Sequence, residues 1–181
     1  ARRCVDETAA VACTGTPPDN AICSGAIPLT GTSVCSPVSG STANATLTGS
    51  TAGGCGGGDP SDAVWYSFVA TDQFHFVSLQ PSAQFYGTLD VYGGPCSNLS
   101  LVNCSYADGL GFPMDLPASG LTIGATYYVR VYDNYAGTSA TQDFAICVTG
   151  TVGDPCDAQA GTCLLYTSPS PRDRTRSRMP S

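Results

Sequence analysis

The chain contains 181 residues, with 14 acidic residues against seven basic ones and a formal net charge of −7 at neutral pH. Such an acidic surface repels phosphate backbones, so the composition argues against a nucleic-acid partner. No apolar run reaches the length of a membrane-spanning helix, and we therefore expect no membrane insertion.

Short segments of alternating apolar and polar residues, rich in β-branched and aromatic side chains, recur between clusters of Gly, Pro, Ser and Thr. This pattern predicts strands, and no window shows the period of an amphipathic helix. In chain order the predicted strands are residues 64–70, 74–79, 88–92, 99–104, 126–132 and 143–148. Several short strands with frequent turns favour an all-β fold, an antiparallel two-layer β-sandwich.

Cysteines are spread through the first 162 residues, and none of them forms a Cys-x-x-Cys pair. Zinc ligands usually come in such close pairs, so the spacing argues against zinc and for disulfide bonds. Disulfides persist outside the reducing cytosol, which predicts a secreted or cell-surface protein. These cysteines are Cys4, Cys13, Cys23, Cys35, Cys55, Cys96, Cys104, Cys147 and Cys156.

Three disulfides are expected to staple the sandwich, although connectivity does not follow from sequence alone. Two cysteines flank a tight loop, which favours a local bridge. Two others lie at the ends of the unit, where a bridge would join the first strand to the last. With the remaining pair, the expected bridges are Cys96–Cys104, Cys23–Cys147 and Cys35–Cys55.

Two Thr/Gly-rich boundaries resemble each other. Cys13-Thr-Gly-Thr leads to Cys23, and Cys147-Val-Thr-Gly-Thr leads to Cys156 at nearly the same offset. One interpretation is a tandem array with a period of one domain, and the other is two similar linkers by chance. The predicted segments are the end of a preceding unit or a linker in 1–18, a complete sandwich in 19–150, and a linker or the start of the next unit in 151–162.

Residues 163–181 differ in composition from the rest of the chain. They read CLLYTSPSPRDRTRSRMPS and carry four of the seven basic residues, without a strand or helix period. The segment resembles the conceptual translation of a sequencing adapter, which implies a non-native tail. The alternative is a genuine basic tail for an anionic surface.

Five segments of the chain form a recognisable series. They are NAICSGAIPL at 20–29, DAVWYSF at 62–68, YGGPC at 92–96, CS at 104–105 and LTIGATYYVRV at 121–131. In this order they resemble a repeated cysteine-containing module of secreted Bacteroidetes-type multidomain proteins, and the resemblance spans most of residues 19–148. Two positions depart from the pattern, since Ala63 replaces a second Asp and Tyr106 replaces an acidic residue.

This module is similar to the bacterial pre-peptidase C-terminal domains, which are jelly-roll-like sandwiches. The resemblance implies a non-catalytic accessory or adhesion module of a larger secreted or cell-surface bacterial protein, often exported by type IX secretion. Its implied partners are neighbouring domains of the same polypeptide. The alternative is a carbohydrate-binding accessory domain attached to a secreted hydrolase, with a polysaccharide or cell-surface ligand as partner.

No catalytic arrangement is visible in the sequence, so we predict that the unit is not an enzyme. His75 is the only histidine, and a Ser-His-Asp triad would have to use it. No Gly-x-Ser-x-Gly motif lies nearby. We therefore expect His75 to be a solvent-facing strand residue.

Calcium is the cofactor that the acidic residues could hold. Asp59 and Asp62 sit in and after a Gly-rich loop, and flexible Gly/Asp loops can supply the oxygens that calcium requires. The competing interpretation is that Asp caps backbone N–H groups in turns. Further aspartates expected at strand ends or turns are Asp90, Asp108, Asp115 and Asp133.

Tyrosines could supply a stacking platform for sugar rings or an adhesive face. Tyr106 and Tyr135 lie in predicted loops and are the candidate ligand-binding pair. Aromatic residues within strands usually serve packing instead, and this is the expected role of Trp65.

Overall fold

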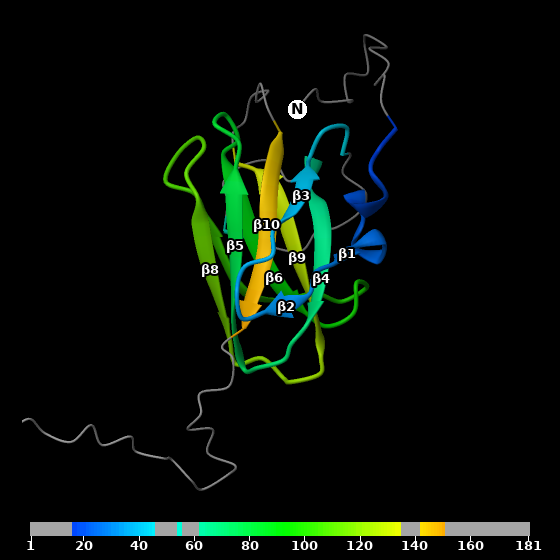
Figure 1. The fold of residues 1–181 in the computed structure, drawn as a ribbon. Helices are drawn as coiled ribbons and strands as arrows, with labels where there is room; N and C mark the ends of the chain where they lie inside the picture. Colours follow the sequence, from blue (N-terminus) through cyan, green and yellow to red (C-terminus); the bar gives the residue numbers. More distant parts are fainter. Residues whose placement is uncertain (1–15, 46–53, 56–61, 135–141, 151–181) are drawn as a thin grey trace, which may run out of the picture.

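The computed structural model describes residues 16–45, 54–55, 62–134 and 142–150. In these residues the chain forms two sheets packed face to face, which confirms the expected all-β sandwich (Figure 1). Two short 3₁₀ helices, η1 (Asp19–Ala21) and η2 (Cys23–Gly25), precede the strands. The strands are β1 (Ile27–Pro28), β2 (Gly31–Thr32), β3 (Val38–Ser41), β4 (Val64–Val69), β5 (Phe74–Pro81), β6 (Gly87–Gly93), β7 (Ser100–Tyr106), β8 (Met114–Ser119), β9 (Thr126–Asp133) and β10 (Asp143–Gly150). No helix within the described ranges is long and apolar enough to cross a membrane.

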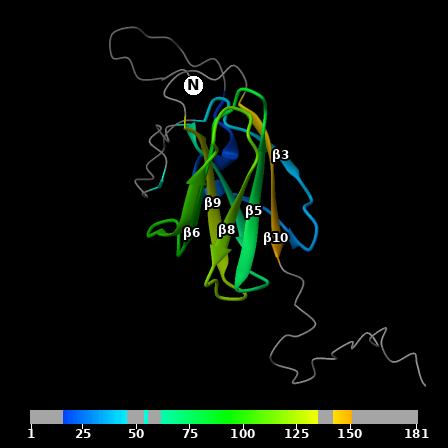
Figure 2. The same ribbon diagram turned by 90° about the vertical axis from the view of Figure 1, so that its left-hand side faces the viewer.

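The two sheets are named here after their central strands. The β9 sheet has the order β1-β4-β9-β6-β7, and the β10 sheet has the order β2-β10-β5-β8, with β3 also paired to β10. Figure 2 separates these layers, with β6 and β9 on one side and β5, β10 and β3 on the other. The long strands pair antiparallel, as expected. The two-residue strands β1 and β2 differ, since each adds in parallel at a sheet edge.

Strand β8 was not predicted, because Pro113 directly precedes it and Pro117 lies within it. Proline lacks the N–H that a central strand needs, but an edge strand tolerates it. In the β10 sheet β8 is the outermost strand and pairs with β5. On this side the two sheets are also linked, since Asn103 Nδ2 in β7 donates to the Pro117 carbonyl at 2.8 Å.

The main core lies between the sheets and follows the period-two alternation of the strands. In β5, Val77 and Leu79 face inward and are fully buried, whereas Phe76 and Gln80 face outward. The same phase places apolar side chains of β4, β6, β9 and β10 in one cluster. Its strand members include Val64, Tyr66, Phe68, Leu89, Val91, Leu116, Val129, Val131, Phe144, Ile146 and Val148.

The predicted disulfide pairing is wrong for all three bridges, although all six cysteines involved do form disulfides. The observed bridges have Cα–Cα distances between 5.5 and 5.7 Å. They are Cys23–Cys96, Cys35–Cys147 and Cys55–Cys104.

The physical reason is the position of the cysteines along the strands and on the layers. Cys104 lies well inside β7 opposite Asp90, so the extended strand carries it away from Cys96 in the preceding loop. Cys23 and Cys147 lie on different layers, since Cys23 packs on the β9 sheet and Cys147 belongs to β10. A disulfide needs Cα atoms within about 7 Å, and the observed pairs meet this condition.

Candidate functional site

Of the residues predicted to bind calcium, only Asp62 lies in the described part of the chain. It lies two residues before β4 and is almost completely buried, with 5% of its surface exposed. Asp59 lies outside the described residues. Over the ranges that the structure describes, no three His, Cys, Asp or Glu side chains gather as metal ligands would. Calcium binding at Asp59 and Asp62 therefore stays a prediction.

Of the predicted ligand-binding tyrosines, Tyr106 is the last residue of β7 and is half exposed, at 49%. Tyr135 lies outside the described residues, but its neighbour Asn134 is placed. The Asn134 N–H donates to the Tyr86 carbonyl at 2.7 Å, and the Ala107 N–H donates to the Gly87 carbonyl at 2.9 Å. The chain after β7 and the chain after β9 thus flank the same end of β6.

The loop between β7 and β8 exposes further apolar side chains that the sequence analysis did not single out. Leu110 and Phe112 are 50% and 56% exposed. The Gly111 N–H donates to the Phe85 carbonyl at 3.0 Å, which holds this loop against the turn between β5 and β6. With Tyr106, this end of the sandwich therefore carries several exposed apolar groups.

His75 is buried, which corrects the expectation of a solvent-facing side chain. It is in phase with Val77 and Leu79, so the alternation of β5 directs it inward. Its Nε2 accepts hydrogen bonds from the N–H groups of Thr71 at 3.1 Å and Asp72 at 3.2 Å. Imidazole can accept at Nε2 only when it is neutral. The observed role of His75 is thus to hold the turn between β4 and β5.

This position makes the stability of the fold sensitive to acid. Burial lowers the pKa of His75 below 6.5, against opposing contributions from the backbone of Thr149 and the charge of Asp72. As the pH falls below about 6.5, the unfolded chain takes up a proton before the folded chain does, so the free energy of unfolding decreases. Above that pH the titration of His75 no longer changes the free energy of unfolding.

We expect His75→Gln to remove this component of the pH dependence, because Gln can accept a hydrogen bond but does not titrate. Urea unfolding of the wild type and the variant at pH 7.5 and pH 5 measures it. The wild type should lose more stability between the two pH values than the variant. Equal losses would contradict the role assigned to His75.

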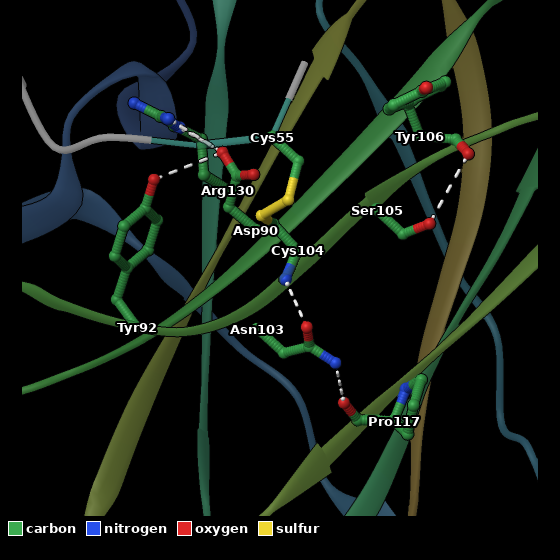
Figure 3. Close-up of a disulfide and its surroundings, with 9 residues drawn as sticks. All are labelled: Cys55, Asp90, Tyr92, Asn103, Cys104, Ser105, Tyr106, Pro117 and Arg130. Atoms are coloured by element: carbon green, nitrogen blue, oxygen red, sulfur yellow. Dashed lines mark hydrogen bonds and ion pairs between the residues drawn. A yellow bond between two sulfur atoms is a disulfide. The ribbon is translucent and has the colours of Figure 1, made fainter.

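A buried ion pair occupies the outer face of the β9 sheet. Asp90 in β6 and Arg130 in β9 are directly opposite, and Arg130 Nη2 and Nε donate to Asp90 Oδ2 at 2.7 and 3.0 Å (Figure 3). The Tyr92 hydroxyl donates to the same oxygen at 3.2 Å. Asp90 is fully buried and Arg130 is 2% exposed. Asp90 therefore lies in mid-strand and not at the strand end or turn expected for it.

Aromatic rings surround the guanidinium of Arg130. Its Cζ lies 5.7 Å from the ring centroid of Trp65, 5.3 Å from that of Tyr92 and 5.1 Å from that of Tyr132. Such contacts stabilise a cation that has lost its water. We refer to Asp90, Arg130, Trp65, Tyr92 and Tyr132 as the ion-pair cluster. The predicted packing role of Trp65 is confirmed, but the residue packs outside the main core.

The backbone at Gly54, which is far from Asp90 and Arg130 in the sequence, covers the ion pair. A Cβ atom at Gly54 would lie 2.5 Å from Asp90 Oδ2 and 2.9 Å from Arg130 Nη2, so only glycine fits so closely over the charges. The next residue, Cys55, is bonded to Cys104 in β7 (Figure 3). This disulfide fastens the cover to the sheet.

The electrostatics of the cluster follow from its burial. Burial raises the pKa of Asp90, while hydrogen bonds and the charge of Arg130, the Tyr92 hydroxyl and the backbone of Cys55 act in the opposite direction. Burial and the charge of Asp90 also raise the pKa of the Tyr92 hydroxyl. The cluster is thus held together by charge and by three side-chain hydrogen bonds that converge on one oxygen of the buried carboxylate, Asp90 Oδ2.

The sequence analysis missed this cluster, although one signal for it was present. Arg130 is the only basic residue between Arg3 and Arg172. A single arginine in an apolar strand needs a partner if it is buried, and an aspartate within another apolar strand is a natural candidate. Only the register of β6 against β9 shows that Asp90 is that partner.

No protein-family model matches the chain, and no curated protein sequence matches it. Among solved structures, it is similar to the pre-peptidase C-terminal domain of a collagenase from Bacillus anthracis, with a TM-score of 0.42 and 16% identity. That similarity covers 74% of this chain and 99% of the other.

Proposed function

We propose that this chain is a non-catalytic extracellular accessory module of a larger secreted or cell-surface bacterial protein. The proposal is carried by the structural role of the residues in the motifs quoted above. Trp65, Tyr92, Cys96, Cys104 and Arg130 all belong to the ion-pair cluster or to the disulfides around it. The residues that carry the resemblance thus stabilise a scaffold, which is what a module that spaces or attaches other domains requires.

The three disulfides support an extracellular location. They join segments 49 to 112 residues apart, so the fold depends on bridges that form in an oxidising compartment. Adhesion and passage through type IX secretion belong to the same proposal.

The test is an assay of the full chain for hydrolysis of a peptide, an ester and a glycoside panel. We expect no turnover above the buffer blank. Turnover that co-purifies with the protein and is lost on His75→Ala, in a variant that still unfolds cooperatively, would overturn the proposal.

The second candidate is a carbohydrate-binding accessory domain. The exposed side chains of Tyr106, Leu110 and Phe112 at one end of the sandwich favour it, because sugar rings stack on exposed aromatic faces. Tyr106→Ala should then weaken retention of the full chain on an insoluble polysaccharide. Unchanged retention would exclude this end of the sandwich as the binding surface.

A further inference from the structure

A shallow groove of about 700 Å³ lies on the outer face of the β10 sheet, remote from the ion-pair cluster. It crosses β3, β10 and β5 in the upper part of the sheet that faces the viewer in Figure 1. Gly40, Pro81 and Phe144 give the lining an apolar part, and the remaining side chains that line it are polar. They are Ser39, Ser41, Gln80, Ser82 and Asp143.

The pairing of the strands brings these side chains together. Asp143 in β10 lies opposite Ser41 in β3, and the Ser82 N–H donates to the Asp143 carbonyl at 2.9 Å. One residue row further along β10, Ala145 lies between Ser39 and Gln80. Strand pairing thus brings polar side chains of β3, β10 and the end of β5 into one groove.

The hollow itself has a cause inside the core. A Cβ atom at Gly40 would meet the Tyr66 hydroxyl and the Phe144 ring, so β3 approaches the core more closely than any other residue would permit. Tyr66 is buried, and burial raises the pKa of its hydroxyl to about 12. Because Gly40 lets β3 lie closer to the core at this point, the outer surface of the sheet is recessed there.

The backbone of β10 at the groove is already hydrogen-bonded to both neighbouring strands. Over residues 143–146, β10 pairs with β3 on one side and with β5 on the other. A peptide therefore cannot add to β10 as another strand, since that mode of binding needs an unpaired edge. Recognition over β10 is therefore left to the side chains.

Their chemistry selects the class of ligand. Hydroxyl and amide groups both donate and accept hydrogen bonds, as the hydroxyls of a sugar do. No basic side chain lines the groove, and Asp143 repels anions. A single carboxylate is too few for calcium, which takes six to eight oxygens, commonly from several acidic residues.

We propose that this groove binds a segment of a neutral polysaccharide. The proposal rests on the proposed function, in which the module attaches a larger protein to a surface. The volume lies within the range of ordinary ligand sites, about 300–1,000 Å³. A long polymer can also run across an open groove that would hold a small molecule only weakly.

The test measures retention of the full chain on insoluble cellulose, chitin and β-1,3-glucan, and its retardation in gels containing soluble neutral glycans. The test variants are Gln80→Ala with Asp143→Ala, which removes hydrogen-bonding groups, and Ser41→Trp, which fills the groove. A matched control is Asp115→Ala with Ser119→Ala, two exposed positions on β8 of the same sheet. Thermal unfolding verifies that each variant is folded.

We expect the wild type and the control to bind one of these polymers, and both groove variants to bind at least about tenfold more weakly, as lost hydrogen bonds predict. Wild-type binding by the groove variants, or loss only with Tyr106→Ala, would overturn the groove proposal and leave the accessory function standing. Binding to none of these neutral glycans would also overturn it. Hydrolytic turnover, by contrast, would count against the accessory function.

Discussion

Replacement of Arg130 by Met is expected to lower the free energy of unfolding by about 3–5 kcal/mol. Asp90 is fully buried, and Arg130 provides two of its hydrogen bonds. Without the guanidinium, the carboxylate must remain charged in an apolar setting or take up a proton. The variant also loses the contacts of the guanidinium with Trp65, Tyr92 and Tyr132. Equilibrium unfolding in guanidinium chloride at pH 7 measures the loss.

Two further variants test the origin of that loss. Adding Asp90→Leu to Arg130→Met should restore part of the lost stability, because the double variant no longer buries an unpaired charge. The exposed Asp115, changed to Asn, should stay within about 0.5 kcal/mol of the wild type. If Arg130→Met costs less than about 1 kcal/mol, the ion-pair cluster does not stabilise the fold.

Removal of the Cys35–Cys147 bridge, by changing both residues to Ala, is expected to cost about 4–5 kcal/mol. This bridge spans 112 residues and joins β10 to the segment before β3, so it restricts most of the unfolded chain. Unfolding in guanidinium chloride without reductant gives the cost. A loss below about 1 kcal/mol would show that strand pairing alone holds these segments together.

Non-reducing peptide mapping is the control for this experiment. It should recover peptides linked through Cys23–Cys96, Cys35–Cys147 and Cys55–Cys104 from the wild type. In the double variant the other two bridges should persist. Recovery of a Cys96–Cys104 peptide from the wild type would contradict the observed connectivity.

The six strands expected from the sequence correspond to β4, β5, β6, β7, β9 and β10. Their prediction succeeded because alternation and side-chain type are local properties. Strands β1, β2 and β3 are too short to show a pattern, and β8 carries Pro117, which an edge position tolerates. For these segments, pairing with a neighbouring strand of the same chain decides whether a strand forms.

Among the candidate site residues, some positions were also predicted correctly and others were not. Tyr106 is exposed, as a residue in a predicted loop should be, although the structure places it at the end of β7. His75 was assigned to the wrong face, because the phase of the alternation in β5 depends on which side of the strand meets the core. Neither Asp59 nor Tyr135 lies in the described residues.

The sequence alone determined the class of fold, the use of cysteines as disulfides and the acidic character of the surface, since composition and local alternation carry that information. Only the tertiary structure decided which cysteines pair, that Asp90 and Arg130 meet, and that β3, β10 and β5 form a groove. Each of these depends on the register between strands far apart in sequence. Register is set by how both layers pack at once, and no single segment contains it.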